Sequence, residues 1–166
     1  MEKIYFRDAT SEDLPQIVAI YNSTIKTRIV TADLEPISVQ SKLSWFNEHT
    51  ANKRPLWVVE NQNKLIGWVS FQNFYGRPAY EATAEISIYL HPEHRGKGLG
   101  KQILLHSMRE SRKLGINTLL GYIFAHNEPS LKLFLNAGFE EWAHLPNIAR
   151  LDGVERSVKI LGKRIA

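Results

Sequence analysis

Apolar residues recur along this chain at two spacings, one typical of a helix and one typical of a strand. Between residues 10 and 25 they follow the helical spacing, at Leu14, Ile17, Val18, Tyr21 and Ile25. Between residues 80 and 90 every second residue is apolar, which places on one face of a strand Ala84, Ile86, Ile88 and Leu90. The other face of that strand then carries Glu85, Ser87 and Tyr89.

The same two patterns, punctuated by turn residues, divide the whole chain into expected elements. They are a strand over 3–9, helices over 10–25 and 38–49, two strands around a polar turn within 55–74, a strand over 80–90, a helix over 100–115, a strand over 117–124, a helix over 128–138, and strands over 139–145 and 155–164. The order β-α-α-β-β-β-α-β-α-β-β predicts a mixed α/β fold. With 166 residues, no internal repeat and no low-complexity linker, we expect one domain over 1–166.

Composition narrows the class of protein. Hydrophobic residues make up 43% and charged residues 23% of the chain, which is typical of a globular domain. The apolar runs are far shorter than the roughly 18 residues of a membrane helix, and the first residues have no apolar leader segment, so we expect no membrane partner. The absence of cysteine excludes disulfides and thiolate metal sites and fits a cytoplasmic location. The net charge of +4 comes without a stripe of aromatic and basic residues, so we expect no nucleic-acid partner.

The stretch HPEHRGKGLGKQIL, residues 91–104, places flexible and positive residues together ahead of a helix. The free N–H groups of a helix start attract an anion, and glycines leave those donors open. Arg95, Lys97 and Lys101 add full charges, so the turn is suited to a diphosphate. It is not a P-loop, because Gln102 follows Lys101 where serine or threonine is required. A glycine-rich turn that binds nothing is the alternative.

Arg95-Gly96-Lys97-Gly98-Leu99-Gly100 also has the form [RQ]-x-x-G-x-[GA], which resembles the coenzyme A-binding signature of GNAT-type N-acetyltransferases. HNEPSLKLFLNAGF, residues 126–139, resembles the second motif of that family. AIYNSTI, TADLEP, GWVSF and RPAYEATAEISIYLHPEHRGKGLG together resemble its phosphinothricin N-acetyltransferase branch.

The resemblance implies a mostly antiparallel central sheet flanked by helices and a homodimer. It also implies acetyl-CoA as the cofactor, with coenzyme A as a product, and an acetyl acceptor that is a small amino-acid-like amine. Acetylation of a peptide or protein N-terminus is a second hypothesis, and a non-catalytic acyl-CoA-binding module is a third.

The resemblance also assigns roles to residues. It makes Glu85 the base, acting through water, where the alternative is a solvated or ion-paired strand glutamate. It places the cofactor against the strand end Ile88, Tyr89 and Leu90, against the glycine turn from Arg95 to Lys101 (Arg95, Gly96, Lys97, Gly98, Leu99, Gly100 and Lys101), and against Asn127 and Ser130. For the last two residues, capping of the helix that follows is the alternative.

Phe134 is a departure from the family pattern, because many relatives have tyrosine or histidine there and phenylalanine cannot donate a proton. Tyr122, Tyr89 or a water would then protonate the leaving thiolate, or the thiolate leaves unprotonated. For the acceptor, the segment NFYGRPAY supplies Arg77, able to pair with a carboxylate, beside Phe74, Tyr75 and Tyr80. Thr27, Arg28 and Thr31 are candidates for the opposite wall. We expect no metal site, since His91 and His94 lack a third ligand in a suitable pattern.

Overall fold

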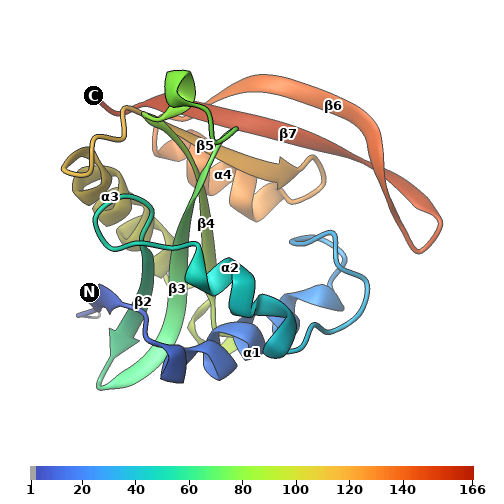
Figure 1. The fold of residues 1–166 in the computed structure, drawn as a ribbon. Helices are drawn as coiled ribbons and strands as arrows, with labels where there is room; N and C mark the ends of the chain where they lie inside the picture. Colours follow the sequence, from blue (N-terminus) through green and yellow to red (C-terminus); the bar gives the residue numbers. More distant parts are fainter. Residues whose placement is uncertain (1–2) are drawn as a thin grey trace.

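A computed structural model describes residues 3–166 (Figure 1). Its elements follow the predicted order, with short 3-10 turns between some of them. They are β1 (Tyr5–Asp8), α1 (Leu14–Ile25), α2 (Leu43–Asn47), β2 (Leu56–Asn61), β3 (Lys64–Asn73), β4 (Thr83–Leu90), α3 (Leu99–Arg112), β5 (Thr118–Phe124), α4 (Glu128–Asn136), β6 (Glu140–Leu151) and β7 (Val154–Arg164). The mixed α/β class predicted from the sequence is confirmed.

The strands form one seven-stranded sheet in the order β1-β2-β3-β4-β5-β7-β6. Neighbouring strands are antiparallel except β4 and β5, which are parallel. The β2–β3 turn has positive φ at both Gln62 (48°) and Asn63 (61°), the conformation that tight hairpins favour. The long β6–β7 hairpin curves away from the rest of the sheet toward the loop after α1 (Figure 1).

Helices cover both faces of the sheet. The side chains of β4 point alternately toward one face and the other. On one face α3 and α4 pack over a core to which β4 contributes Ala84 and Ile86, at 0% and 2% exposure. On the other face α1 packs over Trp68 of β3, which also contacts Tyr89. The Trp68 indole N–H donates to the carbonyl of Ile17 at 3.1 Å. Glu85 and Tyr89 therefore share one face of β4, as predicted, and that face lies on the α1 side of the sheet.

The two largest differences from the predicted element boundaries are in α2 and β6. The helix expected over 38–49 is a 3-10 turn (Gln40–Lys42) followed by the short α2. Ser38 and Ser41 bond each other's backbone at its start, and such local bonds compete with helical ones. The strand expected over 139–145 continues to Leu151, because β6 is an edge strand whose register shift between Leu145 and Ala149 accommodates the intervening proline.

No helix within residues 3–166 has the length and apolar character needed to cross a membrane. Within the same residues, no group of three or more histidine, cysteine, aspartate or glutamate side chains is arranged to hold a metal ion.

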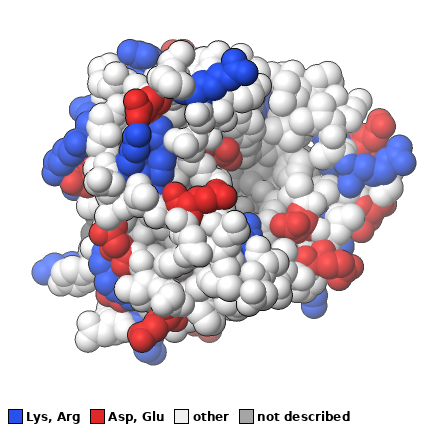
Figure 2. All heavy atoms as spheres, viewed as in Figure 1, with Lys and Arg blue, Asp and Glu red and all other residues white. Residues whose placement is uncertain are grey.

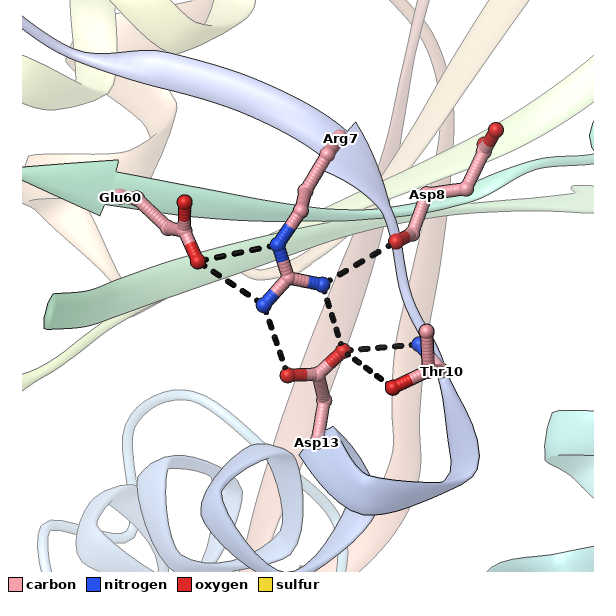
Figure 3. A network of polar contacts seen from close by, with 5 residues as sticks. All are labelled: Arg7, Asp8, Thr10, Asp13 and Glu60. Carbon is pink, nitrogen blue, oxygen red and sulfur yellow. Dashed lines mark hydrogen bonds and ion pairs between the residues drawn. The ribbon is translucent and has the colours of Figure 1, made fainter. Parts of the chain in front are cut away.

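An ionic network joins β1, β2 and the start of α1 (Figure 3). The Arg7 guanidinium donates to both carboxylate oxygens of Asp13, at 2.8 and 2.9 Å, and lies 2.8 Å from Glu60. Asp13 also accepts the Thr10 backbone N–H at 2.7 Å. These hydrogen bonds, led by those from Arg7, lower the pKa of the Asp13 carboxyl below its ordinary value.

Asp13→Asn is expected to lower the free energy of unfolding by about 1–3 kcal/mol at pH 7, because the charge-assisted hydrogen bonds between the mostly buried Asp13 carboxylate and the half-exposed Arg7 guanidinium are lost. The Asp13 side chain is only 12% exposed. A carboxyl with a depressed pKa stabilises the fold above its ordinary pKa of 3.8 and loses that contribution as the pH falls. Urea unfolding at pH 7 and near pH 3.5 should therefore show a difference between the two proteins that shrinks on acidification. An equal difference at both values would contradict the pairing.

Candidate active site

Strands β4 and β5 separate halfway along their length. Their pairing runs from Thr83 opposite Thr118 to Glu85 opposite Leu120 and stops there, although both strands continue for several residues. The backbone groups of β4 that face β5 beyond this point have no strand partner. A cleft opens between them, lined by Val30, Ile86, Ser87, Ile88, Tyr89, Gly121, Tyr122, Ile123, Asn127, Ser130 and Phe134. Figure 2 shows the surface hollowed here, beside the β6–β7 hairpin.

Glu85 is the last residue of β4 that pairs with β5. It lies between Gln72 of β3 and Leu120 of β5 and is half-buried. Its side chain makes no hydrogen bond or ion pair to any other part of residues 3–166, so it is not the ion-paired strand glutamate of the alternative reading. Burial raises the pKa of the Glu85 carboxyl above its ordinary value. A carboxylate in this state is a stronger base than one in water.

Two tyrosines of the cleft lie within the electrostatic reach of Glu85. Burial raises the pKa of Tyr89, with smaller contributions from Tyr21, Glu85 and Asp33. Burial and the charge of Glu85 likewise raise the pKa of Tyr122. Both hydroxyls are therefore neutral at pH 7 and able to donate a proton.

Phe134 closes the bottom of the cleft. Its side chain is 5% exposed and packs edge-on against Phe139, with ring centroids 4.8 Å apart. A Cβ on Gly121 would come within 2.9 Å of the Phe134 ring, so glycine in β5 makes room for the ring. The phenylalanine identified from the sequence as a departure from the family pattern is thus a fixed wall of the cleft.

The glycine turn begins α3 as predicted. Gly96 and Gly98 have φ of 71° and 78°, a backbone conformation that favours glycine. Gln102 makes the first hydrogen bond of the helix, to the carbonyl of Gly98 at 3.4 Å. Within residues 3–166, no acceptor is found for the backbone amides of residues 96–101. A row of free donors at a helix start is an arrangement that suits an anion, as predicted for this turn.

The three cations of the turn differ in orientation. Lys97 and Lys101 are exposed. Arg95 instead points inward, donating to the carbonyl of Leu90 at 2.9 Å and to the Ser23 hydroxyl of α1 at 2.8 Å. The Arg95 side chain therefore holds the end of β4 to α1, while its contact with the cofactor stays a prediction. Its burial lowers the pKa of its guanidinium.

Asn127 and Ser130 begin α4 beside the same cleft. The Asn127 side-chain oxygen accepts the backbone N–H of Ser130 at 3.3 Å, which is the capping bond predicted as an alternative. Asn127 is 5% exposed, and both residues line the cleft. Capping and a cofactor contact are compatible here, because the Asn127 side-chain nitrogen donates no hydrogen bond within residues 3–166.

The residues predicted to bind the acceptor lie in the loop between β3 and β4. Phe74, Tyr75 and Tyr80 pack together with ring centroids 4.6–5.7 Å apart. Arg77 lines a separate hollow of about 390 Å³ together with Arg54 and Glu81. None of the four residues lines the cleft between β4 and β5. Tyr75 nevertheless lies near enough to Tyr122 of that cleft to contribute, after burial and Glu85, to the rise in the pKa of Tyr122.

The loop after α1 contains a polar network that the sequence reading missed. The Tyr21 hydroxyl donates to the Asp33 carboxylate and shares a hydrogen bond with the Thr31 hydroxyl. Thr31 is 8% exposed. Arg28, in the same loop, pairs with Asp152 of the β6–β7 turn at 2.7 Å. Among the predicted wall residues Thr27, Arg28 and Thr31, none lines the cleft, but Val30 between them does.

Comparisons with known proteins agree with this geometry. Residues 3–140 match the family model described as the acetyltransferase (GNAT) domain. A Bacillus subtilis protein with the provisional name phosphinothricin acetyltransferase YwnH is 49% identical over 161 residues, covering 96% of this chain and 98% of that protein. A Pseudomonas paraeruginosa L-methionine sulfoximine/L-methionine sulfone acetyltransferase is 28% identical over 148 residues, covering 89% of this chain and 86% of its own.

Solved structures agree as well. The crystal structure of a provisionally named phosphinothricin N-acetyltransferase superposes with a TM-score of 0.95 at 48% identity, covering 99% of both chains. A phosphinothricin acetyltransferase from Sinorhizobium meliloti, solved with acetyl-CoA, superposes with a TM-score of 0.89 at 28% identity, covering 97% of this chain and 88% of its own. The chain therefore belongs to the GNAT acetyltransferase family and is an N-acetyltransferase that uses acetyl-CoA.

Proposed function

We propose that the enzyme acetylates the amino group of a small amino-acid-like substrate of the phosphinothricin or methionine sulfoximine type. In this proposal Glu85 is the base and acts through a water molecule. The observation that carries it is the position of Glu85, half-buried and without a partner within residues 3–166, where β4 and β5 separate. The names of the relatives support the substrate class.

The same proposal seats acetyl-CoA along the cleft. The free amides of residues 96–101 and the charges of Lys97 and Lys101 bind the pyrophosphate. The stretch Ile88, Tyr89 and Leu90, which pairs with β3 but not with β5, binds the pantetheine arm through its backbone groups on the β5 side, and Asn127 and Ser130 contact the arm from α4. Leu99, which is 1% exposed, anchors the turn in the core and contributes only its backbone.

When bound, acetyl-CoA supplies a thioester whose carbonyl carbon is attacked by the neutral amine, so that a C–N bond forms and the C–S bond breaks. An amino acid reaches the site as an ammonium ion, and Glu85 accepts the proton that must leave its nitrogen. Backbone N–H groups of β4 beyond Glu85 are placed to stabilise the charge that develops on the carbonyl oxygen. Phe134 cannot protonate the thiolate, and Tyr122 or Tyr89, each neutral at pH 7, takes that role.

For the acceptor, Phe74, Tyr75 and Tyr80 provide an apolar rim at the end of the sheet where β4 begins. Arg77 remains a predicted carboxylate ligand, although it lines a separate hollow. The single domain over 1–166, the homodimer and the cytoplasmic location likewise remain predictions from the sequence.

A panel of amines tests the substrate class. Thiol release from acetyl-CoA should be fastest with glufosinate, L-methionine sulfoximine or a related amino acid, because relatives of this chain are named for acetylating such compounds. The panel should also contain common amino acids and short peptides with free N-termini. Faster turnover of the peptides than of every amino acid would contradict the proposed substrate class.

A further inference from the structure

The loop between α1 and α2 holds the Asp33 carboxylate in a fixed position. Tyr21 donates a hydrogen bond to it from α1, and the Thr31 hydroxyl lies against both Tyr21 and the Asp33 backbone N–H. The Asn22 side chain ties the end of the loop to α1 through two 2.9 Å bonds with the backbone of Ile37. The loop is thus held to α1 at several points, and its Asp33 carboxylate is oriented by the hydrogen bond from Tyr21 before any ligand arrives.

This carboxylate faces the same side of β4 as Glu85. The Tyr21 ring lies 5.3 Å from the Tyr89 ring, which in turn stacks on Trp68 at 4.5 Å. Tyr89 lines the cleft and follows Glu85 by four residues on the same face of the strand. Tyr89 therefore lies between the two carboxylates.

No cation of the described chain neutralises either carboxylate. Neither Asp33 nor Glu85 forms an ion pair within residues 3–166. Arg28, in the same loop, is occupied by Asp152. The Lys42 ammonium lies over the Tyr21 ring, 5.3 Å from its centroid. Figure 2 shows acidic side chains around the hollow on this face, although the chain as a whole carries a net charge of +4.

Two unpaired carboxylates flanking one aromatic wall are the surroundings that an ammonium ion requires. We propose that Asp33, positioned by Tyr21 and Thr31, binds the ammonium group of the incoming amine and holds it beside Glu85. Glu85 then takes the proton, and Asp33 keeps its charge throughout. This assignment rests on the proposed function, since it adds a second carboxylate to the same acceptor site.

The test uses the Asp33→Asn variant, in which the side chain keeps its shape and still accepts the hydrogen bond from Tyr21. It compares how well the variant binds the charged amine and its uncharged acetylated product. With L-methionine sulfoximine as the acceptor, we expect KM for the amine to rise about tenfold or more, with KM for acetyl-CoA within about twofold of wild type. The inhibition constant of the N-acetylated product, whose nitrogen is uncharged, should also stay within about twofold. Tyr21→Phe should raise KM for the amine by a smaller factor than Asp33→Asn does. This variant keeps the Asp33 charge and removes only the hydrogen bond that orients it.

Glu35→Gln is the matched control, since it removes an exposed charge two residues further along the same loop. It should leave all three constants at their wild-type values. An unchanged KM for the amine in Asp33→Asn would overturn the assignment, as would equal weakening of the amine and of the acetylated product. If the wild-type enzyme acetylates no amine of the panel, the proposed function itself is wrong. If the wild-type enzyme is active but Asp33→Asn leaves KM for the amine unchanged, only the assignment of Asp33 is wrong.

Discussion

Glu85→Gln is expected to lower kcat by about 100-fold or more at neutral pH, with KM for acetyl-CoA within about twofold of wild type. The amide keeps the size of the side chain but cannot accept the proton from the amine, and a positioned general base contributes about 10²–10⁴-fold to such reactions. The proposed cofactor contacts lie on the backbone of β4 and on the glycine turn, which the substitution does not alter. Steady-state thiol release with each substrate varied in turn measures both quantities.

The pH dependence gives an independent readout. Because the protonated carboxyl cannot act as a base, kcat/KM of the wild type should fall as the pH decreases through the pKa of Glu85, which burial places above the ordinary 4.5. The variant should lack this acidic limb. Glu155→Gln, an exposed strand glutamate on β7, is the matched control and should keep both the rate and the limb. A variant Glu85→Gln that retains the wild-type rate would reject Glu85 as the base.

Reversing both free charges of the glycine turn, in Lys97→Glu with Lys101→Glu, is expected to raise KM for acetyl-CoA about tenfold or more. Two attractive charges beside the pyrophosphate become repulsive, and each exposed pair contributes up to about 1 kcal/mol, where 1.4 kcal/mol is tenfold in affinity. The KM for the amine should stay within about twofold. Because exposed charges are screened, the difference from wild type should shrink as salt is raised.

Lys113→Glu serves as the control for this double variant, since it reverses an exposed charge just beyond the other end of α3. It should leave both Michaelis constants unchanged. Equal increases in KM for acetyl-CoA and for the amine in the double variant would mean that the turn supports the whole fold rather than the cofactor.

Local patterns in the sequence predicted the parts of the site that depend on backbone conformation. The alternation through β4 placed Glu85 and Tyr89 on one face, because side chains of a strand alternate whatever the rest of the chain does. Gly96 and Gly98 adopt the left-handed backbone conformation that favours glycine. The capping hydrogen bond from the Ser130 N–H to Asn127 could also be predicted, because it joins residues only three positions apart in the sequence.

Parts of the site that depend on tertiary packing could not be predicted in this way. Arg95 turns inward because Ser23, 72 residues away in the sequence, offers it a hydrogen bond. Asp33 lies in the segment after the helix expected over 10–25, where the sequence pattern predicts no further element. Its proposed role depends on the hydrogen bond from Tyr21 and on its position opposite β4. The separation of Arg77 from the cleft likewise follows from how the β3–β4 loop folds back over Arg54.

A crystal structure of the enzyme with bound acetyl-CoA tests the central claim most directly. The account predicts the pyrophosphate within hydrogen-bonding distance of the backbone amides of residues 96–101, and the thioester carbonyl in the cleft where β4 and β5 separate, next to Glu85. Acetyl-CoA bound at full occupancy with its thioester outside that cleft, or with its pyrophosphate away from the glycine turn, would contradict it.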